Sequence, residues 1–182
     1  MKTTRIVLLA CTWLAATAVS AFANDDTARK SARTEVVFFE PENFTDATDT
    51  YLGGEKSRAS VLDQIRDHLQ KSTALRLPEG YTLKITITDV DLAGEFEPWR
   101  GGSLRDVRIV KEIYPPRINL AFKLTNAEGE TVKSGERTLR DTSFQMSVTP
   151  ASSSDPLRYE KAMLDDWLRT EFGRSLAHNP KS

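Results

Sequence analysis

The chain has 182 residues, with 25 lysines and arginines against 26 aspartates and glutamates, and a formal net charge of −1. This balance excludes the strongly basic surface typical of nucleic-acid-binding proteins, and no polybasic amphipathic stretch indicates a helix that lies on a membrane. The length suits one domain that buries a substantial core.

The first residues have the order of a secretory signal peptide. Lys2 and Arg5 give a short positive region, and the uncharged, mostly apolar run Ile6–Ala18 follows. Ala21-Phe22-Ala23 then supplies the small residues that a signal peptidase requires. We therefore expect residues 1–23 to be removed by cleavage after Ala23, leaving a periplasmic protein without an integral membrane segment.

A membrane anchor and a lipoprotein are the two alternatives for this N-terminus. The apolar run is shorter than the ~20 residues that span a bilayer, and too few apolar residues precede Cys11 for a lipid-attachment site. Cys11 is the only cysteine. Cleavage after Ala23 would therefore leave a domain without disulfides, cysteine chemistry or a cysteine-based metal site.

The first half of the remaining chain predicts a polar leader over residues 24–33, a strand over Thr34–Phe39 and a loop up to Gly54. A helix is predicted over Ser57–Ala74, capped by Ser60 or beginning nearer Gly54. Its apolar residues recur at helical spacing: Val61, Leu62, Ile65 and Leu69.

Strand signals dominate the second half. The four predicted strands cover Tyr81–Asp89, Leu104–Tyr114, Ile118–Leu124 and Glu130–Arg140. The last two are joined by a short turn, and a final helix follows with Asp155 as N-cap and Pro156 at its first position. The order β-α-β-β-β-β-α predicts an α+β fold: a mostly antiparallel sheet of about five strands with two helices packed on one face. It forms a single domain over residues 34–176 with a polar tail over 177–182.

Four short strings have a familiar order along this chain. They are Phe44-Thr45-Asp46, Asp89-Val90-Asp91-Leu92-Ala93-Gly94, Pro115-Pro116-Arg117-Ile118 and the stretch from Tyr159-Glu160-Lys161 through Asp166-Trp167-Leu168. Together they resemble domain of unknown function 3016, a family of exported bacterial proteins, over about Glu35 to Phe172. The resemblance implies export and carries over no catalytic, cofactor or binding residue.

Asp89 and Asp91 are the least expected residues of the predicted strands. Continued alternation would aim both carboxylates at the core, where an unpaired charge is costly. Either a β-bulge shifts the alternation so that Val90 and Leu92 face the core, or the two acids meet cations. The candidate arginines are Arg100, Arg105, Arg108 and Arg140.

Glu95 and Glu97 extend this acidic group and raise the alternative of a weak Ca²⁺ or Mg²⁺ site. Their spacing matches no EF-hand loop, and solvated surface acids are the commoner meaning. Two histidines without a neighbouring nucleophile motif, His68 and His178, do not indicate nucleophilic catalysis or a zinc site. We predict no cofactor and no specific metal ligands.

The loop Leu92–Arg105 is the best candidate for a binding surface. Trp99 and Arg100 lie beside Gly101-Gly102 and follow no apolar stripe, and Trp and Arg are the residues most enriched at interaction hot spots. Partial burial of Trp99 under the loop is the alternative. With Arg105, Asp89 and Asp91, these residues form the candidate binding set.

We therefore predict a non-enzymatic periplasmic domain that binds an envelope protein or a small ligand, but not nucleic acid. Two alternatives stay open. One is a hydrolase of envelope polymers that uses Asp89, Asp91 and loop glutamates, which requires two carboxylates in a cleft without a neighbouring arginine. The other is a weak divalent-cation-binding protein.

Overall fold

The fold is that of a computed structural model, which describes residues 33–102, 105–146 and 154–173. The predicted signal peptide with its cleavage site, the leader up to residue 32 and the tail over 177–182 lie outside the described residues. Those assignments therefore stay predictions. Over the described ranges, no helix combines the length and the apolar character needed to cross a membrane.

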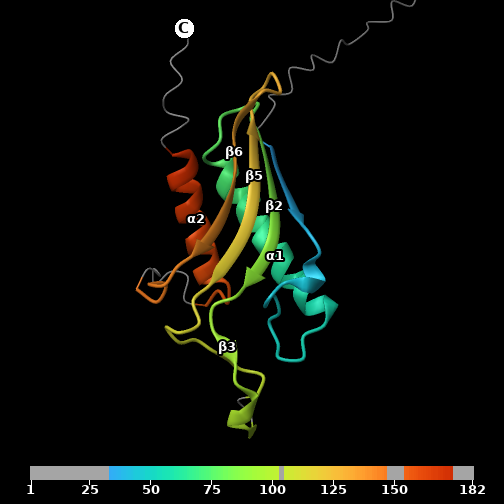
Figure 1. Cartoon of the computed structure of the whole chain (residues 1–182), viewed down its shortest axis with the longest axis vertical. Coiled ribbons are helices and arrows are strands. Elements are labelled where there is room, and N and C mark those ends of the chain that lie inside the picture. Colours follow the sequence, from blue (N-terminus) through green and yellow to red (C-terminus); the bar gives the residue numbers. More distant parts are fainter. Residues whose placement is uncertain (1–32, 103–104, 147–153, 174–182) are drawn as a thin grey trace, which may run out of the picture.

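Four strands form the main sheet, in the spatial order β1-β2-β5-β6 (Figure 1). They are β1 (Arg33–Phe38), β2 (Thr82–Asp91), β5 (Arg117–Thr125) and β6 (Thr131–Arg140). β1 is parallel to β2, and the other two pairs are antiparallel. A parallel pair needs a crossover connection, which the helix α1 (Glu55–Ala74) provides.

Both helices, α1 and α2 (Arg158–Phe172), lie on the same face of the sheet (Figure 1). The predicted apolar stripe of α1 is buried along its whole length. α1 begins directly after Gly54, the earlier of its two predicted starting points. The predicted α+β class, with a mostly antiparallel sheet and two helices on one face, is confirmed.

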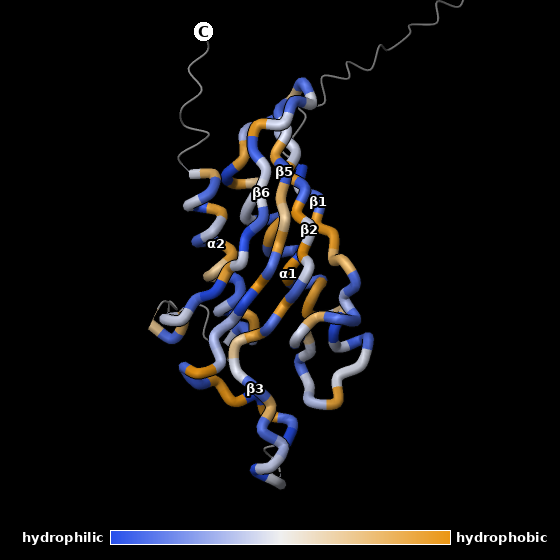
Figure 2. Tube along the Cα trace, in the orientation of Figure 1, coloured by the Kyte–Doolittle hydropathy of each residue, from blue (hydrophilic) through white to orange (hydrophobic). Residues whose placement is uncertain are grey.

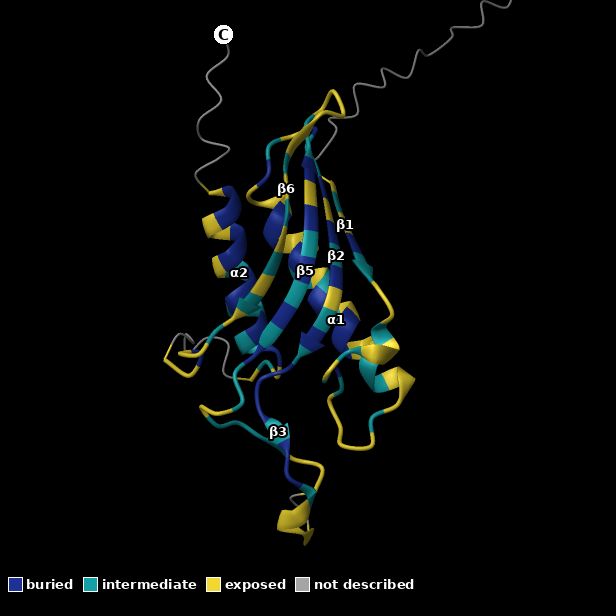
Figure 3. Ribbon diagram, viewed as in Figure 1, coloured by how far each residue is buried: buried dark blue, intermediate teal, exposed yellow. Residues whose placement is uncertain are grey.

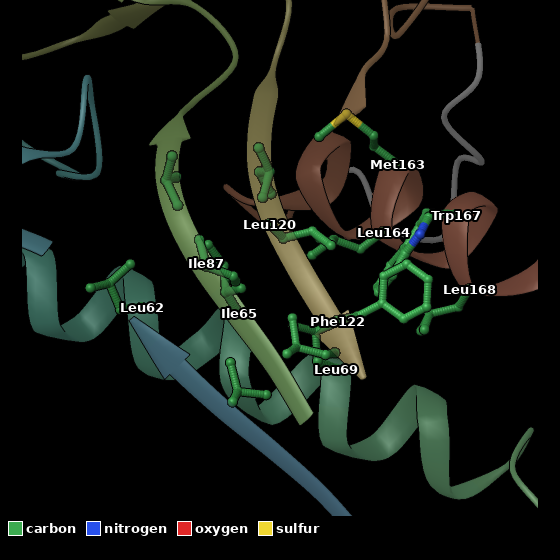
Figure 4. Packing of buried hydrophobic residues seen from close by; sticks show 14 of the residues in the cluster. Leu62, Ile65, Leu69, Ile87, Leu120, Phe122, Met163, Leu164, Trp167 and Leu168 are labelled. Atoms are coloured by element: carbon green, nitrogen blue, oxygen red, sulfur yellow. The ribbon is translucent and has the colours of Figure 1, made fainter. Parts of the chain in front are cut away.

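The hydrophobic core fills the space between the helices and the sheet (Figure 4). Ile65 of α1 and Leu164 of α2 are completely buried, and each such side chain contributes about 1.5–3 kcal/mol by leaving water. The ring of Phe122 meets Trp167 and Phe172 edge-on, with centroids 5.7 and 5.5 Å apart. Hydropathy and burial alternate along β2 and β5 (Figures 2 and 3), which leaves the opposite face of the sheet polar.

The strand predicted over Leu104–Tyr114 does not join the main sheet, which has four strands rather than five. Leu104 lies outside the described residues, and the rest of the segment contributes only β4 (Arg108–Ile109), paired with β3 (Glu95–Phe96) in a separate small sheet. The physical reason is the position of β2. A strand that follows it directly would pair with β2, but β1 and β5 already occupy both of its edges.

The start of α2 also differs from its prediction. The helix begins at Arg158, and Leu157 rather than Asp155 is its N-cap residue. Asp155 instead stabilises the preceding turn, because its Oδ1 accepts the Leu157 N–H at 2.9 Å. Its other carboxylate oxygen lies 2.6 Å from Nζ of Lys161. An Asp-Pro pair therefore marks the approach to this helix but not its first turn.

Candidate functional site

A thin extension projects from the end of the sheet opposite the end where α2 finishes (Figure 1). We call it the arm and define it as residues 92–102 and 105–114. It contains β3, the short helix η2 (Pro98–Arg100) and β4. At its base the Gly94 N–H donates to the Tyr114 carbonyl at 3.0 Å. Gly94 has φ 82°, and an added Cβ would lie 2.8 Å from the Ile109 carbonyl oxygen, so only glycine fits this crossing.

A buried carboxyl group ties the base of the arm to α2. Glu160 is only 1% exposed, and its Oε1 accepts the N–H of Ala93 at 2.7 Å. Its Oε2 has no hydrogen-bond partner among the described residues. Burial raises the pKa of Glu160, because a charged carboxylate would lose its hydration there.

Arg108 ties the arm to the loop that precedes α1. Its guanidinium donates to both carboxylate oxygens of Asp46, at 2.6 and 3.0 Å, and to the Thr48 carbonyl at 2.7 Å. The same group lies over the ring of Phe96, 4.4 Å from its centroid. Asp46 in turn forms an isolated β-bridge with Asp91 at the end of β2. The base of the arm is therefore held by α2, by the loop that precedes α1 and by the hydrogen bond between its own two strands of chain.

The predicted bulge in β2 is confirmed. The β2–β5 register shifts between Ile87 and Asp89, and Val90 and Leu92 are buried in the core as a consequence. Both acids thereby leave the core face. The strict alternation of buried and exposed residues does not continue past Ile87. Burying an unpaired carboxylate costs more free energy than losing one step of hydrogen bonding between the two strands.

Asp89 and Asp91 do meet a cation, but it is Arg117 of β5 rather than one of the four arginines proposed from the sequence. Nη2 of Arg117 lies 3.1 Å from Asp89 and 3.4 Å from Asp91. Asp89 also accepts hydrogen bonds from the amide and hydroxyl of Thr45, at 2.8 and 3.0 Å. Burial raises the pKa of Asp91, and the charge of Arg117 partly opposes this shift.

Inside the arm, Glu97 is the centre of a second ion-pair cluster. It is 2% exposed and accepts from Arg100, Lys111 and, at 3.3 Å, the Tyr114 hydroxyl. The hydrogen bond from Lys111 is the main cause of the lowered pKa of Glu97. Its own partners cover this carboxylate, so it braces the arm. Within 33–102, 105–146 and 154–173, no three His, Cys, Asp or Glu side chains are grouped to hold a metal ion.

The arm exposes two large apolar side chains at different places along its length. Trp99, in η2, is 72% exposed, and Ile113 near the returning base is 71% exposed. Arg100 is exposed beside Trp99, while Arg105 lies over the ring of Tyr51, 5.7 Å from its centroid. The candidate residues therefore fall into two places, with Trp99 and Arg100 on the arm and Asp89 and Asp91 in the ion-pair network at its base.

A helix–helix contact that the sequence analysis missed places His68 beside α2. Its Nε2 lies 3.3 Å from Oδ2 of Asp165, and the Ser72 hydroxyl donates to Oδ1 of the same carboxylate at 2.7 Å. Burial lowers the pKa of His68. The Ser72 hydroxyl also lies 3.5 Å from the same Nε2 of His68. Hydroxyl and carboxylate therefore share one ring nitrogen, whereas a catalytic triad places the acid on the opposite nitrogen of the imidazole.

Fold and geometry together define a two-layer α+β domain whose distinctive surface is a braced arm. The family model described as "Protein of unknown function (DUF3016)" matches residues 32–170, and the chain belongs to this family. The matched range includes β1, the arm and most of α2. No curated protein matches the chain.

Proposed function

We propose that this protein is an exported, non-enzymatic binding domain that holds a protein partner of the cell envelope through its arm. One observation carries the proposal: an exposed Trp99 at the end of an arm that is fixed to the body at its base. Trp and Arg dominate the energetics of protein interfaces, and Arg100 lies directly beside Trp99. The signal-peptide pattern of residues 1–23 supports the periplasm as the place where this happens.

The construction of the arm favours binding over an incidental loop. Arg108 and Glu160 hold its base, and Glu97 braces its interior through Arg100 and Lys111. A surface ordered in advance loses less conformational entropy when a partner binds. Burying Trp99 and Ile113 in an interface would contribute on the order of 1.5–3 kcal/mol for each side chain.

The carboxylate-hydrolase alternative requires two acids without a cationic neighbour. Asp89 and Asp91 do not meet this requirement, because Arg117 contacts both. The cation-binding alternative relied on Glu95 and Glu97. Glu97 already has two basic partners, which occupy the oxygens that a cation would need.

Site-specific photo-crosslinking in the periplasm of the native host tests the proposal. A photoreactive residue at position 99 is expected to give a discrete crosslinked species. The matched control is a photoreactive residue at position 75, since Leu75 is also an exposed apolar residue but lies at the end of α1. Equal crosslinking from positions 99 and 75 would overturn the assignment of the arm.

A mass measurement of the recovered protein accompanies this experiment. A chain that begins at Asn24 is the expected result of export and cleavage. A chain that begins at a lipidated Cys11 would contradict the proposed soluble periplasmic form.

A further inference from the structure

A groove of about 850 Å³ runs between β6 and α2. Four consecutive strand residues line it, Arg137–Arg140, and α2 contributes Met163 and Trp167. The groove contains no residue of the arm, so it is a separate feature from the proposed arm surface.

The lining residues place the groove at the backbone edge of β6. Successive residues of a strand point to opposite faces, and Leu139 pairs with the core residue Ile118, so Leu139 points toward α2. Thr138 and Arg140 therefore point to the open face of the sheet. Residues of both orientations line one groove only where that groove follows the strand edge. β6 is the last strand of the sheet and pairs with β5 alone.

The α2 side of the groove offers apolar surface and one unused donor. Met163 and Trp167 are largely buried and contact the core. The Nε1 of Trp167 is buried and has no hydrogen-bond partner among the described residues. A buried N–H without an acceptor is unfavourable. The donor is covered in the free protein, so a ligand reaches it only when the Trp167 side chain moves.

The charges of the groove are mostly paired with one another. Arg76 lies 3.5 Å from Asp165, Arg137 contacts Glu171, and Arg169 contacts Asp166. Two charged lining residues have no ion pair over the described part of the chain, Arg140 and Asp141, and the Asp141 carboxylate accepts the Ser143 N–H at 2.9 Å. The exposed side chain of Arg140 lies on the open face of the sheet, and alternation places Asp141 on the other side. On the open-face side of the strand edge, the charge still to be matched is therefore positive.

We propose that this groove binds an extended peptide segment of another protein as an additional strand beside β6. Strand addition uses the free main-chain groups of an edge and selects side chains at alternate positions. One face of the peptide presents apolar side chains to Met163 and Trp167. The other face carries an acidic residue opposite Arg140.

The other end of β6 limits where the peptide pairs. Lys133 and Arg137 point toward the helix layer, where Glu171 binds both. Inward-pointing charges are a common protection of sheet edges against strand pairing. The peptide therefore pairs with Thr138–Arg140 and not with the beginning of the strand.

The test uses a capped hexapeptide of alternating threonine and valine in which one threonine is glutamate, and a second in which it is lysine. Each is titrated into the isotope-labelled chain from Asn24 onward and followed by NMR. The glutamate peptide is expected to shift the amides of Thr138–Arg140 and the indole N–H of Trp167. A Trp99→Phe variant distinguishes this indole signal from that of Trp99.

Arg140→Glu is expected to weaken binding of the glutamate peptide at least tenfold and to strengthen binding of the lysine peptide. Lys123→Glu is the matched control, because it makes the same charge change on an exposed residue of the open face, and it is expected to alter neither affinity. Methylation of alternate peptide amides is expected to abolish binding. Equal affinities of the two peptides, unchanged binding after methylation, or no shifts at millimolar peptide would each overturn the proposal. None of these results depends on the arm.

Discussion

The body and the arm of this protein are stabilised by different forces. The body places apolar side chains from two helices and the sheet in one core (Figure 4), whereas the arm depends on Glu160, Arg108 and Glu97. Apolar burial is non-directional, but ion pairs and hydrogen bonds require particular partners at particular distances. Changes in the core should therefore affect the whole molecule, while changes in the arm contacts should free the arm and leave the body folded.

The largest effect is expected from Leu164→Ala in the core. Leu164 is completely buried, and removing such a side chain costs about 2–5 kcal/mol through lost burial and the remaining cavity. Urea unfolding measures the loss. Leu75→Ala, at an exposed leucine, is the control and should change the free energy of unfolding by no more than about 0.5 kcal/mol. Similar losses in the two variants would contradict this account of the core.

Arg108→Ala should have the next largest effect, and it should be local. It leaves the mostly buried carboxylate of Asp46 without its cation, which costs about 2–4 kcal/mol for a pair of this burial. Hydrogen exchange should accelerate at the base of the arm, while the amides of β2 and β5 stay protected. Adding Asp46→Asn removes the stranded charge and should restore part of the loss. Uniform acceleration across the sheet would show that arm and body do not separate.

Glu160→Gln tests how the contact between the arm and α2 makes folding stability depend on pH. The pKa of Glu160 is raised above its ordinary value of 4.5 by burial, so the folded state retains a proton that the unfolded chain releases. The stabilisation contributed by Glu160 is therefore fully present below pH 4.5, the ordinary pKa of the unfolded chain. It decreases as the pH rises toward the raised pKa of the folded state. The variant lacks this loss, and its stability relative to the native chain should increase from about pH 4 to pH 8. Thermal unfolding over this range measures the difference, and a constant difference would contradict an ionisable buried Glu160.

The smallest effect on stability is expected from Trp99→Ala. The side chain is 72% exposed, so unfolding should change by about 0.5 kcal/mol or less. A loss of unfolding free energy well above this value would mean that Trp99 packs within the folded domain, which would contradict its proposed role in binding a partner. Circular dichroism during thermal unfolding is sufficient to decide.

Local patterns along the sequence predict the elements that rely on local periodicity. α1 follows from its apolar stripe, the β5–β6 hairpin from alternation and a short turn, and the bulge at Asp89 from the cost of burying a carboxylate. Each of these requires knowledge of only a few neighbouring residues. The α+β class follows from their order along the chain.

The arm and its contacts depend on information that neighbouring residues do not contain. The segment 105–114 alternates like a strand, and only the occupied edges of β2 exclude it from the main sheet. Arg117 and Glu160 find their partners across 26 and 67 residues of sequence. Trp99 is identifiable from the sequence because it follows no apolar stripe. Trp167 lies in the core, and its unpaired indole N–H is visible only in the folded structure.

The parallel pairing of β1 has a consequence for the order in which the molecule folds. Arg33–Phe38 pairs with Thr82–Ile87, so the strand nearest the N-terminus has no partner until the whole of α1 and most of β2 have been synthesised. Non-local pairing of this kind slows folding, because the intervening chain must be ordered first. A chain that emerges N-terminus first therefore presents an unpaired β1 for longer than any other strand, and this is the segment that a chaperone would have to protect.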